Sequence, residues 1–459
     1  MDRIFTSQTL DKVDKKIKLA GWVHRTRRMG SIVFIDLRDR EGLIQVVFDK
    51  HFKEARELRP EFVIELEGKV VKRELKNINT DSPTGEIEVQ ATSLKVLAKA
   101  KTPPFEIENE ERQASEELRL KYRYLDLRHE RMKKNLILRH KVIKFIRDWL
   151  STSGFMEIET PLLTKGTPEG AREYIVPSRN FAGQFYVLPQ SPQQFKQLLM
   201  VAGLEKYFQI ARCFRDEDAR GDRQAEFTQL DLEMSFVSQE DILKLSEELF
   251  IQLVQKICPE KKIAKIPFPR LSYDESMKKY KSDKPDLRKN KKDNNELAFA
   301  WVLNPPLFEK SVTEKKWVST HHPFTMPVED DIELLDKEPK KVKAQSYDIV
   351  LNGFEIGTGS VRIHEASLQY KIFQILGLNE KEIQERFGHM LEAFSYGVPP
   401  HAGIAPGLDR LVMILAGEPN IREVIAFPKT ADARDLMMGA PSELPESQVK
   451  EAYIKKLKN

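Results

Sequence analysis

The sequence predicts an α+β fold that consists of a small N-terminal β-barrel and a larger domain of mixed strands and helices. Its 459 residues are enough for two or three domains with a large apolar core. The first hundred residues contain five short strand-like stretches. From Gly166 onward, strand and helix patterns follow one another without a strict β–α alternation, and no glycine-rich phosphate loop occurs. These observations argue against a doubly wound nucleotide-binding fold.

Five strand patterns fill the N-terminal region, which we assign to residues 1–102. Short strands in this number are typical of a small barrel such as an OB-fold. Pro103 and Pro104 interrupt the pattern. Residues 103–128 are therefore predicted to form a hinge, and residues 129–459 the larger domain. The expected strands are residues 17–23, 32–37, 43–48, 62–71 and 86–97.

A long helix followed by a strand opens the larger domain. Apolar residues recur at helical spacing over residues 130–153, and Gly154 can end the helix. The stretch from Phe155 to Pro161 then predicts a strand that the proline closes. The apolar face of the helix consists of Leu138, Val142, Phe145 and Trp149.

Two further strands are joined by a long, charged loop. Apolar residues 207–211 and 232–236 flank residues 214–231, which combine arginines, alternating acids and a phenylalanine. In such a loop an arginine can bind a phosphate, and an acid can accept a hydrogen bond from an adenine amine or hold a metal. The aromatic ring can stack on a base. A hairpin with a solvated charged loop is the alternative from the pattern alone.

A helix start near the C-terminal end is the second candidate for ligand binding. Residues 408–415 have the spacing of an amphipathic helix, and Gly407 lets the backbone pass close to a ligand. Arg410 lies in the first turn, where unpaired N–H groups favour anions. Together with Arg215 in the charged loop, it suits a bent triphosphate. A buried helix with a structural arginine is the alternative.

Two acids in a strand-turn-strand pattern offer ligands for the cation that phosphates require. Asp348 and Glu355 lie seven residues apart. Carboxylate oxygens are hard ligands that suit Mg²⁺. Taken alone, two acids at this spacing say little.

Composition and charge fit a soluble protein that meets nucleic acid. The hydrophobic fraction is 40% and the charged fraction 32%. The net charge of +4 and the pI near 8.6 are compatible with RNA binding without requiring it. Only Cys213 and Cys258 occur, so neither a disulfide framework nor a cysteine zinc site is expected. No signal-peptide pattern or apolar run of membrane length is present, so we expect a cytoplasmic protein without a membrane partner.

The long helix with its strand, the charged loop and the helix start resemble motifs one, two and three of class II aminoacyl-tRNA synthetases. Over nearly its whole length the chain resembles the bacterial-type aspartyl-tRNA synthetases. The matching stretches occur in the same order, which makes the likeness specific. They are residues 21–25, 34–42, 122–128, 167–172, 190–193, 321–325, 359–364 and 426–430.

This resemblance implies an OB-fold anticodon-binding domain and a class II catalytic domain with an antiparallel sheet flanked by helices. It implies an aspartate–tRNA ligase that activates L-aspartate with ATP and Mg²⁺ and transfers it to the 3′ end of tRNA-Asp. A homodimer formed through the motif-one helix and strand is also implied. The implied catalytic residues are Arg215, Glu217 and Arg410, with Asp348 and Glu355 as metal ligands. The implied ATP contacts are Arg215, Asp216, Glu217, Gln224, Phe227, Glu355, Gly407, Leu408, Asp409 and Arg410. The implied aspartate contacts are Glu169, Ser191, Gln193, Lys196, Arg215, Asp231, His321 and Arg362.

Charge gives the aspartate assignment a physical basis. Asp231 and Glu169 can bind the substrate ammonium, and Arg215 can hold the α-carboxylate near the α-phosphate. Arg362 can hold the side-chain carboxylate through a two-pronged pair, with Lys196 beside it. Two cations around one carboxylate match the amide of asparagine poorly, which favours aspartate.

The barrel is implied to bind the single-stranded anticodon. Phe34 is the expected stacking ring, and Gln45 can bond to a base edge. Arg25 and Arg27 lie where phosphates or bases would pass. Strand alternation puts Phe34 on the face opposite its two apolar neighbours. A position in the barrel core is the alternative.

The chain departs from the family pattern where bacterial members carry a folded insertion. Only a short basic, asparagine-rich stretch remains near residues 278–298, too short for a core of its own. The insertion is therefore predicted to be deleted, which leaves its contacts with the tRNA acceptor arm in doubt. Within the motifs, Pro406 replaces a large apolar residue and Thr358 replaces a glycine.

Four alternatives stay open. They are a non-discriminating enzyme that also charges tRNA-Asn, an asparaginyl-tRNA synthetase, an asparagine-forming ligase that ignores tRNA, and a non-catalytic RNA-binding relative. Lys196 and Arg362 weigh against asparagine, and the barrel weighs against a ligase without tRNA. The charged residues of the implied ATP site weigh against a non-catalytic protein.

Overall fold

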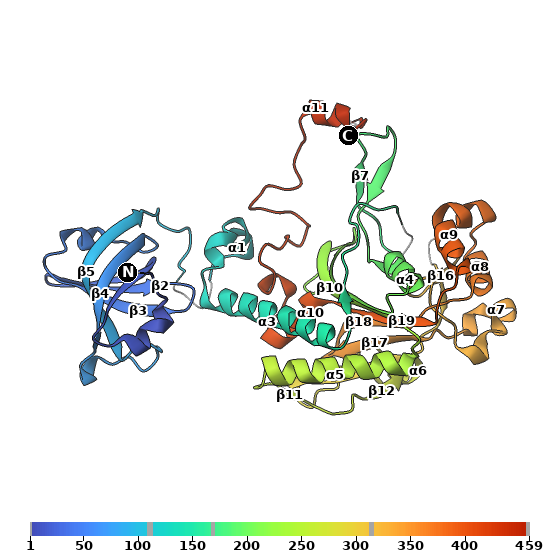
Figure 1. Ribbon diagram of the computed structural model, residues 1–459, viewed down its shortest axis with the longest axis horizontal. Helices are drawn as coiled ribbons and strands as arrows, with labels where there is room; N and C mark the ends of the chain where they lie inside the picture. The colour runs from blue at the N-terminus through green and yellow to red at the C-terminus, as the bar shows by residue number, and fades with distance from the viewer. Residues whose placement is uncertain (1, 108–112, 167–169, 312–315, 456–459) are drawn as a thin grey trace. The chain divides into compact units, whose positions relative to one another are not determined.

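The computed structural model describes residues 2–107, 113–166, 170–311 and 316–455. It separates into two compact units, Met1–Ala114 and Ser115–Asn459 (Figure 1). The segment 103–128, predicted as a hinge, is divided between them, because its second half folds into short helices that pack within the second unit. In the described part of the chain, no helix has the length and apolar character needed to cross a bilayer.

The first unit is a closed barrel with strand order β1-β2-β3-β5-β4. Inward-facing residues alternate with outward-facing ones, so Val33 and Ile35 are fully buried while Phe34 between them is half-buried. All five predicted strands are confirmed, although β1 extends further than the sequence indicates. The elements are η1 (Thr6–Lys12), β1 (Lys16–Met29), β2 (Ile32–Arg38), β3 (Leu43–Phe48), η2 (Lys53–Glu57), β4 (Val63–Lys72), η3 (Leu75–Asn77) and β5 (Ile87–Ala98).

The second unit is built on an eight-stranded sheet. In spatial order its strands are β12 (Arg270–Ser272), β14 (Phe299–Leu303), β17 (Ser346–Leu351), β18 (Phe354–Val361), β19 (His401–Pro406), β10 (Glu226–Ser235), β9 (Lys206–Phe214) and β6 (Met156–Glu157). The expected antiparallel pairing holds in the centre, but both edge strands join in parallel, so the sheet is mixed. A parallel neighbour is reached through a long crossover connection, which local sequence patterns do not reveal. The strand predicted from residue 155 to 161 shortens to β6.

One face of this sheet is apolar and is covered by α3 (Glu130–Thr152), α5 (Gln239–Ile257) and α10 (Leu408–Ala416) (Figure 1). Strand β10 shows the division clearly. Leu230 and Leu232 belong to the apolar core with these helices, whereas Asp231 and Glu233 alternate with them and point to the opposite face. The sheet therefore presents a buried polar face on the side away from the helices.

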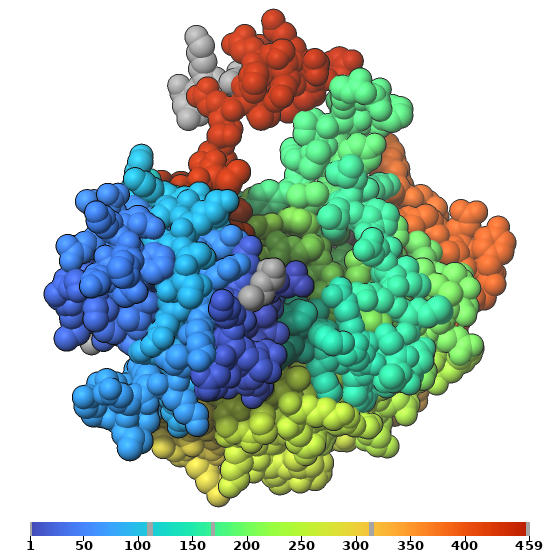
Figure 2. All heavy atoms as spheres, turned by 60° about the vertical axis from the view of Figure 1, so that its left-hand side comes forward, coloured from blue at the N-terminus to red at the C-terminus, as the bar shows by residue number. Residues whose placement is uncertain are grey.

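A smaller apolar cluster joins α8 (Ala366–Ile375) and α9 (Glu380–Ser395), where the Phe373 and Phe387 rings stack with centroids 4.3 Å apart. The hairpin of β7 (Ile175–Pro177) and β8 (Phe185–Val187) stands out from the rest of the unit in Figures 1 and 2. The remaining elements are α1 (Glu116–Lys121), α2 (Arg123–Asp126), α4 (Gln193–Val201), β11 (Lys262–Ile263), α6 (Tyr273–Tyr280), β13 (Glu296–Leu297), β15 (Phe308–Lys310), β16 (Trp317–Ser319), η4 (Glu329–Asp331), α7 (Leu334–Lys337), η5 (Pro339–Lys341), η6 (Ile421–Glu423) and α11 (Glu446–Glu451).

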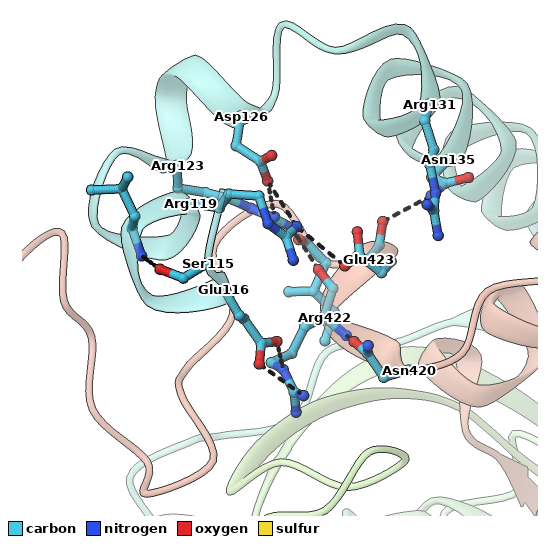
Figure 3. A network of polar contacts seen from close by, with 12 residues as sticks. Ser115, Glu116, Arg119, Arg123, Asp126, Arg131, Asn135, Asn420, Arg422 and Glu423 are labelled. Atoms are coloured by element: carbon cyan, nitrogen blue, oxygen red, sulfur yellow. Dashed lines mark hydrogen bonds and ion pairs between the residues drawn. The ribbon is translucent and has the colours of Figure 1, made fainter. Parts of the chain in front are cut away.

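A buried arginine ties α2 to the turn around η6 (Figure 3). Arg123 donates from Nε to the carbonyl of Ala426 at 2.9 Å, and from Nη2 to the carbonyls of Ile425 at 2.8 Å and Arg422 at 2.5 Å. Its Nη1 pairs with Asp126 at 2.5 Å. One side chain thus satisfies three carbonyls of a segment about 300 residues further along the chain.

We expect Arg123→Met to lower the free energy of unfolding of the second unit by about 3–5 kcal/mol, because it leaves buried carbonyls and a buried carboxylate poorly compensated. A urea titration followed by tryptophan fluorescence measures this loss. Lys121→Met, at an exposed position of α1, is the matched control and should unfold like the wild type. Equal stability of the two variants would contradict the assigned role of Arg123. The tryptophans of the second unit are Trp149, Trp301 and Trp317.

Candidate active site

A cavity of about 560 Å³ opens on the polar face of the sheet. Its walls come from α4, the β9–β10 loop, β10, β18, the junction of β19 with α10, and the segment that follows β16. Residues far apart in the sequence therefore converge on one space. The predicted site residues that line it are Ser191, Gln193, Lys196, Arg215, Glu217, Gln224, Phe227, Asp231, His321, Glu355, Arg362, Gly407, Asp409 and Arg410.

Of the predicted ligand and metal contacts, three that the structure describes do not line the cavity wall, and a fourth falls outside the described ranges. Glu169 lies outside the described residues. Leu408 is fully buried in the apolar core on the other face of the sheet, so its side chain cannot contact ATP. Asp216 is exposed, and its backbone pairs with Arg172 instead. Asp348 is buried just behind the wall, next to the lining residue Thr358.

The predicted RNA-binding residues lie together on the outside of the barrel. Arg27 is the cross-strand partner of Phe34, and it donates to Gln45 Oε1 at 3.0 Å. Arg25 is exposed opposite Asp36 on the neighbouring strand. An aromatic ring, an amide and two guanidinium groups thus share one surface of the first unit.

Four buried charges form a compact group in the cavity wall. Lys196 Nζ donates to Asp231 Oδ2 at 3.1 Å and lies 3.2 Å from Glu233 Oε2. Arg362 donates from Nε and Nη2 to the two carboxylate oxygens of Glu233, at 2.9 and 3.1 Å. Each of the four side chains is at most 2% exposed. The two positive and two negative charges attract one another at these distances. This attraction offsets the free-energy cost of removing the four charges from water.

The two-pronged pair predicted between Arg362 and a ligand is made with Glu233 instead. Arg362 Nη1 lies 2.7 Å from His322 Nε2 and donates to Ser360 Oγ at 2.5 Å. Within the described residues, one N–H of Arg362 and one of Lys196 therefore remain for a ligand. Glu233 was not predicted, although a second acid two residues after Asp231 on a strand indicates a shared face.

The two acids of the group have opposite pKa shifts. Burial raises the pKa of Asp231, and Lys196 opposes this effect. Burial also acts to raise the pKa of Glu233, but Arg362 and Lys196 outweigh it and lower the pKa to about 2. Glu233 is thus the permanent counter-ion of the two cations, and Asp231 is the acid that a ligand ammonium can engage.

Five buried polar atoms of cavity-lining residues have no hydrogen-bond partner among the described residues: Arg215 Nε, Asp231 Oδ1, Ser319 Oγ, Thr320 Oγ1 and His321 Nε2. Asp231 Oδ1 nevertheless lies 3.1 Å from Lys196 Nζ, within ion-pair distance. Buried polar atoms are almost always paired, so unpaired ones in a cavity indicate groups that await a ligand. The Arg215 guanidinium also lies 5.1 Å from the ring centroid of Phe227. The structure therefore places a cation and an aromatic ring together in the cavity, as the sequence of the charged loop indicated.

The second predicted arginine, Arg410, is held by both sides of the cavity. It donates from Nη1 to the carbonyl of Glu355 at 2.7 Å and pairs through Nη2 with Asp222 at 3.2 Å. Glu217 pairs with Arg223 at 2.7 Å within the charged loop. Asp222 and Arg223 were not predicted as site residues, because only their position in the folded loop brings them to the cavity.

Two side chains that were predicted to contact a ligand form hydrogen bonds mainly within the protein and hold its backbone in place. Gln224 exchanges two hydrogen bonds with the backbone of Lys429, at 2.7 and 3.0 Å. Asp409 accepts from Arg139 at 2.5 Å and from the N–H of Thr228 at 2.9 Å. Their polar atoms therefore fix the charged loop and the start of α10.

The acids of the strand-turn-strand segment lie side by side on β17 and β18. Thr358 Oγ1 donates to Asp348 Oδ1 at 2.6 Å and lies 3.3 Å from Glu355 Oε1. Burial and the charge of Glu355 raise the pKa of Asp348 to about 6, against the effect of His321. Two adjacent carboxylates suit a hard cation such as Mg²⁺. No group of three or more acid, histidine or cysteine ligands occurs in the described ranges, so phosphate oxygens and water would complete the set.

A buried histidine behind the charged group predicts a pH dependence of stability. His401 lies 3.1 Å from Gln197 Nε2 and donates from Nδ1 to the carbonyl of Pro399 at 2.8 Å. Burial lowers its pKa from 6.5 to about 4. Below pH 6.5 the unfolded chain therefore takes up a proton that the folded chain refuses until about pH 4, and stability falls over this window.

We expect this histidine to contribute about 2 kcal/mol to the loss of stability between pH 7 and pH 5. His401→Gln should show a correspondingly smaller loss in urea titrations at the two pH values. His140→Gln, at an exposed position of α3, should keep the wild-type dependence. If His401→Gln lost as much stability as the wild type between pH 7 and pH 5, His401 would not be the source of the pH dependence.

Two protein-family models match the chain. The model of the tRNA synthetases class II (D, K and N) matches residues 115–431, and that of the OB-fold nucleic acid binding domain matches residues 17–97. The chain is 44% identical to the aspartate–tRNA(Asp/Asn) ligase of Dehalococcoides mccartyi strain CBDB1, over 97% of this chain and 98% of that protein. It is 41% identical to the aspartate–tRNA ligase of Staphylococcus carnosus, over 97% and 98% of the two chains.

The alignment with the Dehalococcoides protein also shows a difference in length. It runs over 585 residues, whereas 97% of this 459-residue chain is about 445 residues. About 140 aligned positions, 585 less 445, therefore have no counterpart here.

Solved structures share the fold. Asparaginyl-tRNA synthetase from Pyrococcus horikoshii, complexed with asparaginyl-adenylate, is 25% identical with a TM-score of 0.75, covering 94% of this chain and 98% of that one. Aspartyl-tRNA synthetase from Entamoeba histolytica is 23% identical with a TM-score of 0.73, covering 93% and 91%.

Proposed function

Because the chain belongs to the class II tRNA synthetases, in the family of the aspartate–tRNA ligases, we propose that it activates L-aspartate with ATP and transfers it to tRNA. The observation that carries this proposal is the cavity in which the carboxylate of Asp231, the unpaired Arg215 Nε and the remaining N–H groups of Lys196 and Arg362 lie together. An amino acid with one ammonium and two carboxylates matches this set of one acceptor and several donors.

The amino acid is held by complementary charge. Asp231 Oδ1 accepts from the ammonium, and Lys196 and Arg362 donate to the side-chain carboxylate. An asparagine amide would offer its NH₂ to two cations, which donate and do not accept, so aspartate is favoured over asparagine. Arg215 holds the α-carboxylate beside the α-phosphate. Gln193 and Ser191 of the cavity wall supply further polar contacts.

The nucleotide lies against the charged loop and the start of α10. Phe227 stacks on the adenine, and Arg215 and Arg410 bind phosphate oxygens on either side of the reacting phosphorus. Asp348 and Glu355 would hold Mg²⁺, which neutralises charge on the triphosphate. The α-carboxylate oxygen of aspartate attacks the α-phosphorus, and pyrophosphate leaves. The 3′-terminal ribose hydroxyl of the tRNA then attacks the aspartyl carbonyl carbon of the adenylate, and AMP leaves. Positioning and charge neutralisation supply the rate enhancement.

The tRNA substrate includes tRNA-Asp. Acceptance of tRNA-Asn as well is a second candidate, favoured because the Dehalococcoides relative is named an aspartate–tRNA(Asp/Asn) ligase. Charging of purified tRNA-Asp and tRNA-Asn under the same conditions distinguishes the two. Since translation uses these substrates, we place the enzyme in the cytoplasm.

A homodimer formed through the second unit completes the proposal. The support is the motif-one helix and strand, here α3 and β6, which the family resemblance assigns to the dimer contact, and large apolar side chains near β6 and on the β7–β8 hairpin are exposed. Sedimentation of the full chain tests the dimer. The exposed residues are Leu162, Leu163, Ile175, Phe181 and Phe185.

We expect Arg215→Met to lower kcat/KM for aspartate-dependent pyrophosphate exchange by about 100-fold, because it removes charge-assisted hydrogen bonds to phosphate and carboxylate. In the described chain this arginine pairs with no carboxylate, so the fold should survive its loss. Arg212→Met, at an exposed position of β9 three residues before Arg215, should keep exchange within about twofold. Near-normal exchange by Arg215→Met would reject its role.

We expect Phe34→Ala to reduce tRNA charging by about tenfold while leaving pyrophosphate exchange unchanged, because a stacked base is worth about 1–3 kcal/mol. Phe34→Tyr keeps the ring and should charge tRNA nearly as well as the wild type. If alanine lowered both activities equally, the ring would be structural and not a base-stacking group.

A further inference from the structure

Lys284 is a cation that reaches the cavity from the basic stretch predicted to be the remnant of the family insertion. It lines the cavity and pairs through Nζ with Glu355 Oε2 at 2.9 Å. The other oxygen of Glu355 lies 4.0 Å from Arg410 Nη1 and 3.3 Å from Thr358 Oγ1. Lys284 therefore pairs with the Glu355 oxygen that faces away from Arg410 and Thr358. In the proposed function, this carboxylate binds a divalent cation.

The loop that carries Lys284 is fixed by specific contacts. The buried Ser276 of α6 donates to the carbonyl of Ser282 at 2.7 Å, and the N–H of Lys284 donates to Ser282 Oγ at 3.0 Å. Asp286 packs against Gly353 in the β17–β18 turn, where a β-carbon on the glycine would lie 3.3 Å from Asp286 Cβ. The glycine has a φ of +84°. These contacts hold the Lys284 backbone beside the acids.

The side chain itself is partly exposed to solvent. It is 41% exposed, and its only ion pair in the described chain is with Glu355. A flexible four-carbon stem lets an ammonium exchange partners while its backbone stays in place. A divalent cation at Glu355 repels this ammonium, whereas the phosphates that accompany the cation attract it.

We propose that Lys284 holds Glu355 in the empty cavity and moves to the β- and γ-phosphates of ATP when a divalent cation takes its place. This inference rests on the proposed function, because it assumes that a metal–nucleotide complex enters the cavity. It adds a triphosphate-binding residue to those that the motifs indicate. It also gives the short remnant of the insertion a role in nucleotide binding.

Binding measurements on the full-length chain test this role without catalysis. Lys284→Met is compared with the wild type and with Lys278→Met, an exposed lysine of α6. Free Mn²⁺ is titrated by electron paramagnetic resonance without nucleotide, and ATP and AMP are titrated by calorimetry with Mg²⁺. Thermal denaturation confirms that each variant is folded.

We expect Lys284→Met to bind Mn²⁺ about threefold more tightly, because a competing ion pair is gone. It should bind ATP about tenfold more weakly, since a charge-assisted contact is lost. AMP has no β- or γ-phosphate, so its affinity should not change. Lys284→Arg should restore most of the ATP affinity, and Lys278→Met should behave as the wild type.

Two results would overturn the inference. Unchanged Mn²⁺ and ATP affinities would make Lys284 a surface ion pair. An equal loss of affinity for ATP and for AMP would show that Lys284 supports the structure of the cavity and does not bind the β- and γ-phosphates. Failure of the wild type itself to bind ATP would instead reject the proposed function, so the two failures are distinguishable.

Discussion

Four charges buried at one point of the sheet, on Lys196, Asp231, Glu233 and Arg362, constrain the architecture of the second unit. They come from α4, from β10 and from the residue that follows β18, and each is almost completely withdrawn from water. Loss of any one would leave an uncompensated charge in a low-dielectric site. The helix and strands must therefore keep their mutual register, and this rigidity gives the cavity a fixed arrangement of donors and acceptors. In the proposed function, selectivity for an amino acid with two carboxylates follows from that arrangement.

The sequence predicted the elements better than their pairing. Barrel strands and the central strands β9 and β10 were found because apolar residues alternate along them, and α3 and α10 because their apolar residues follow the helical period. The short edge strand β6 and the parallel pairing at both edges were not predictable, because pairing direction depends on long connections. The division of segment 103–128 likewise depends on contacts with residues near 425, which no local pattern contains.

Sequence motifs predicted which side chains belong to the candidate site. They predicted less well which group each side chain pairs with, because tertiary contacts decide that. Arg215, Asp231 and Arg410 converge on one cavity because their motifs occupy neighbouring elements. Arg362 was predicted as a ligand for a carboxylate, but the fold gives its two-pronged pair to Glu233. The contribution of Lys284 to the site was not predicted. Lys284 and Glu355 are far apart in the sequence, and only the fold brings their side chains into contact.

The Arg123 cluster has a practical consequence for work on separate fragments. An expression fragment of the catalytic unit that started at residue 129, the boundary suggested by sequence patterns, would omit the guanidinium that satisfies the carbonyls of Arg422, Ile425 and Ala426. The same segment carries the N–H of Ile421, which donates to the carbonyl of Gly221 in the charged loop. Such a truncated enzyme would be impaired in its charged β9–β10 loop, far along the chain from the missing residues. A fragment that begins at or before Ser115 keeps this support.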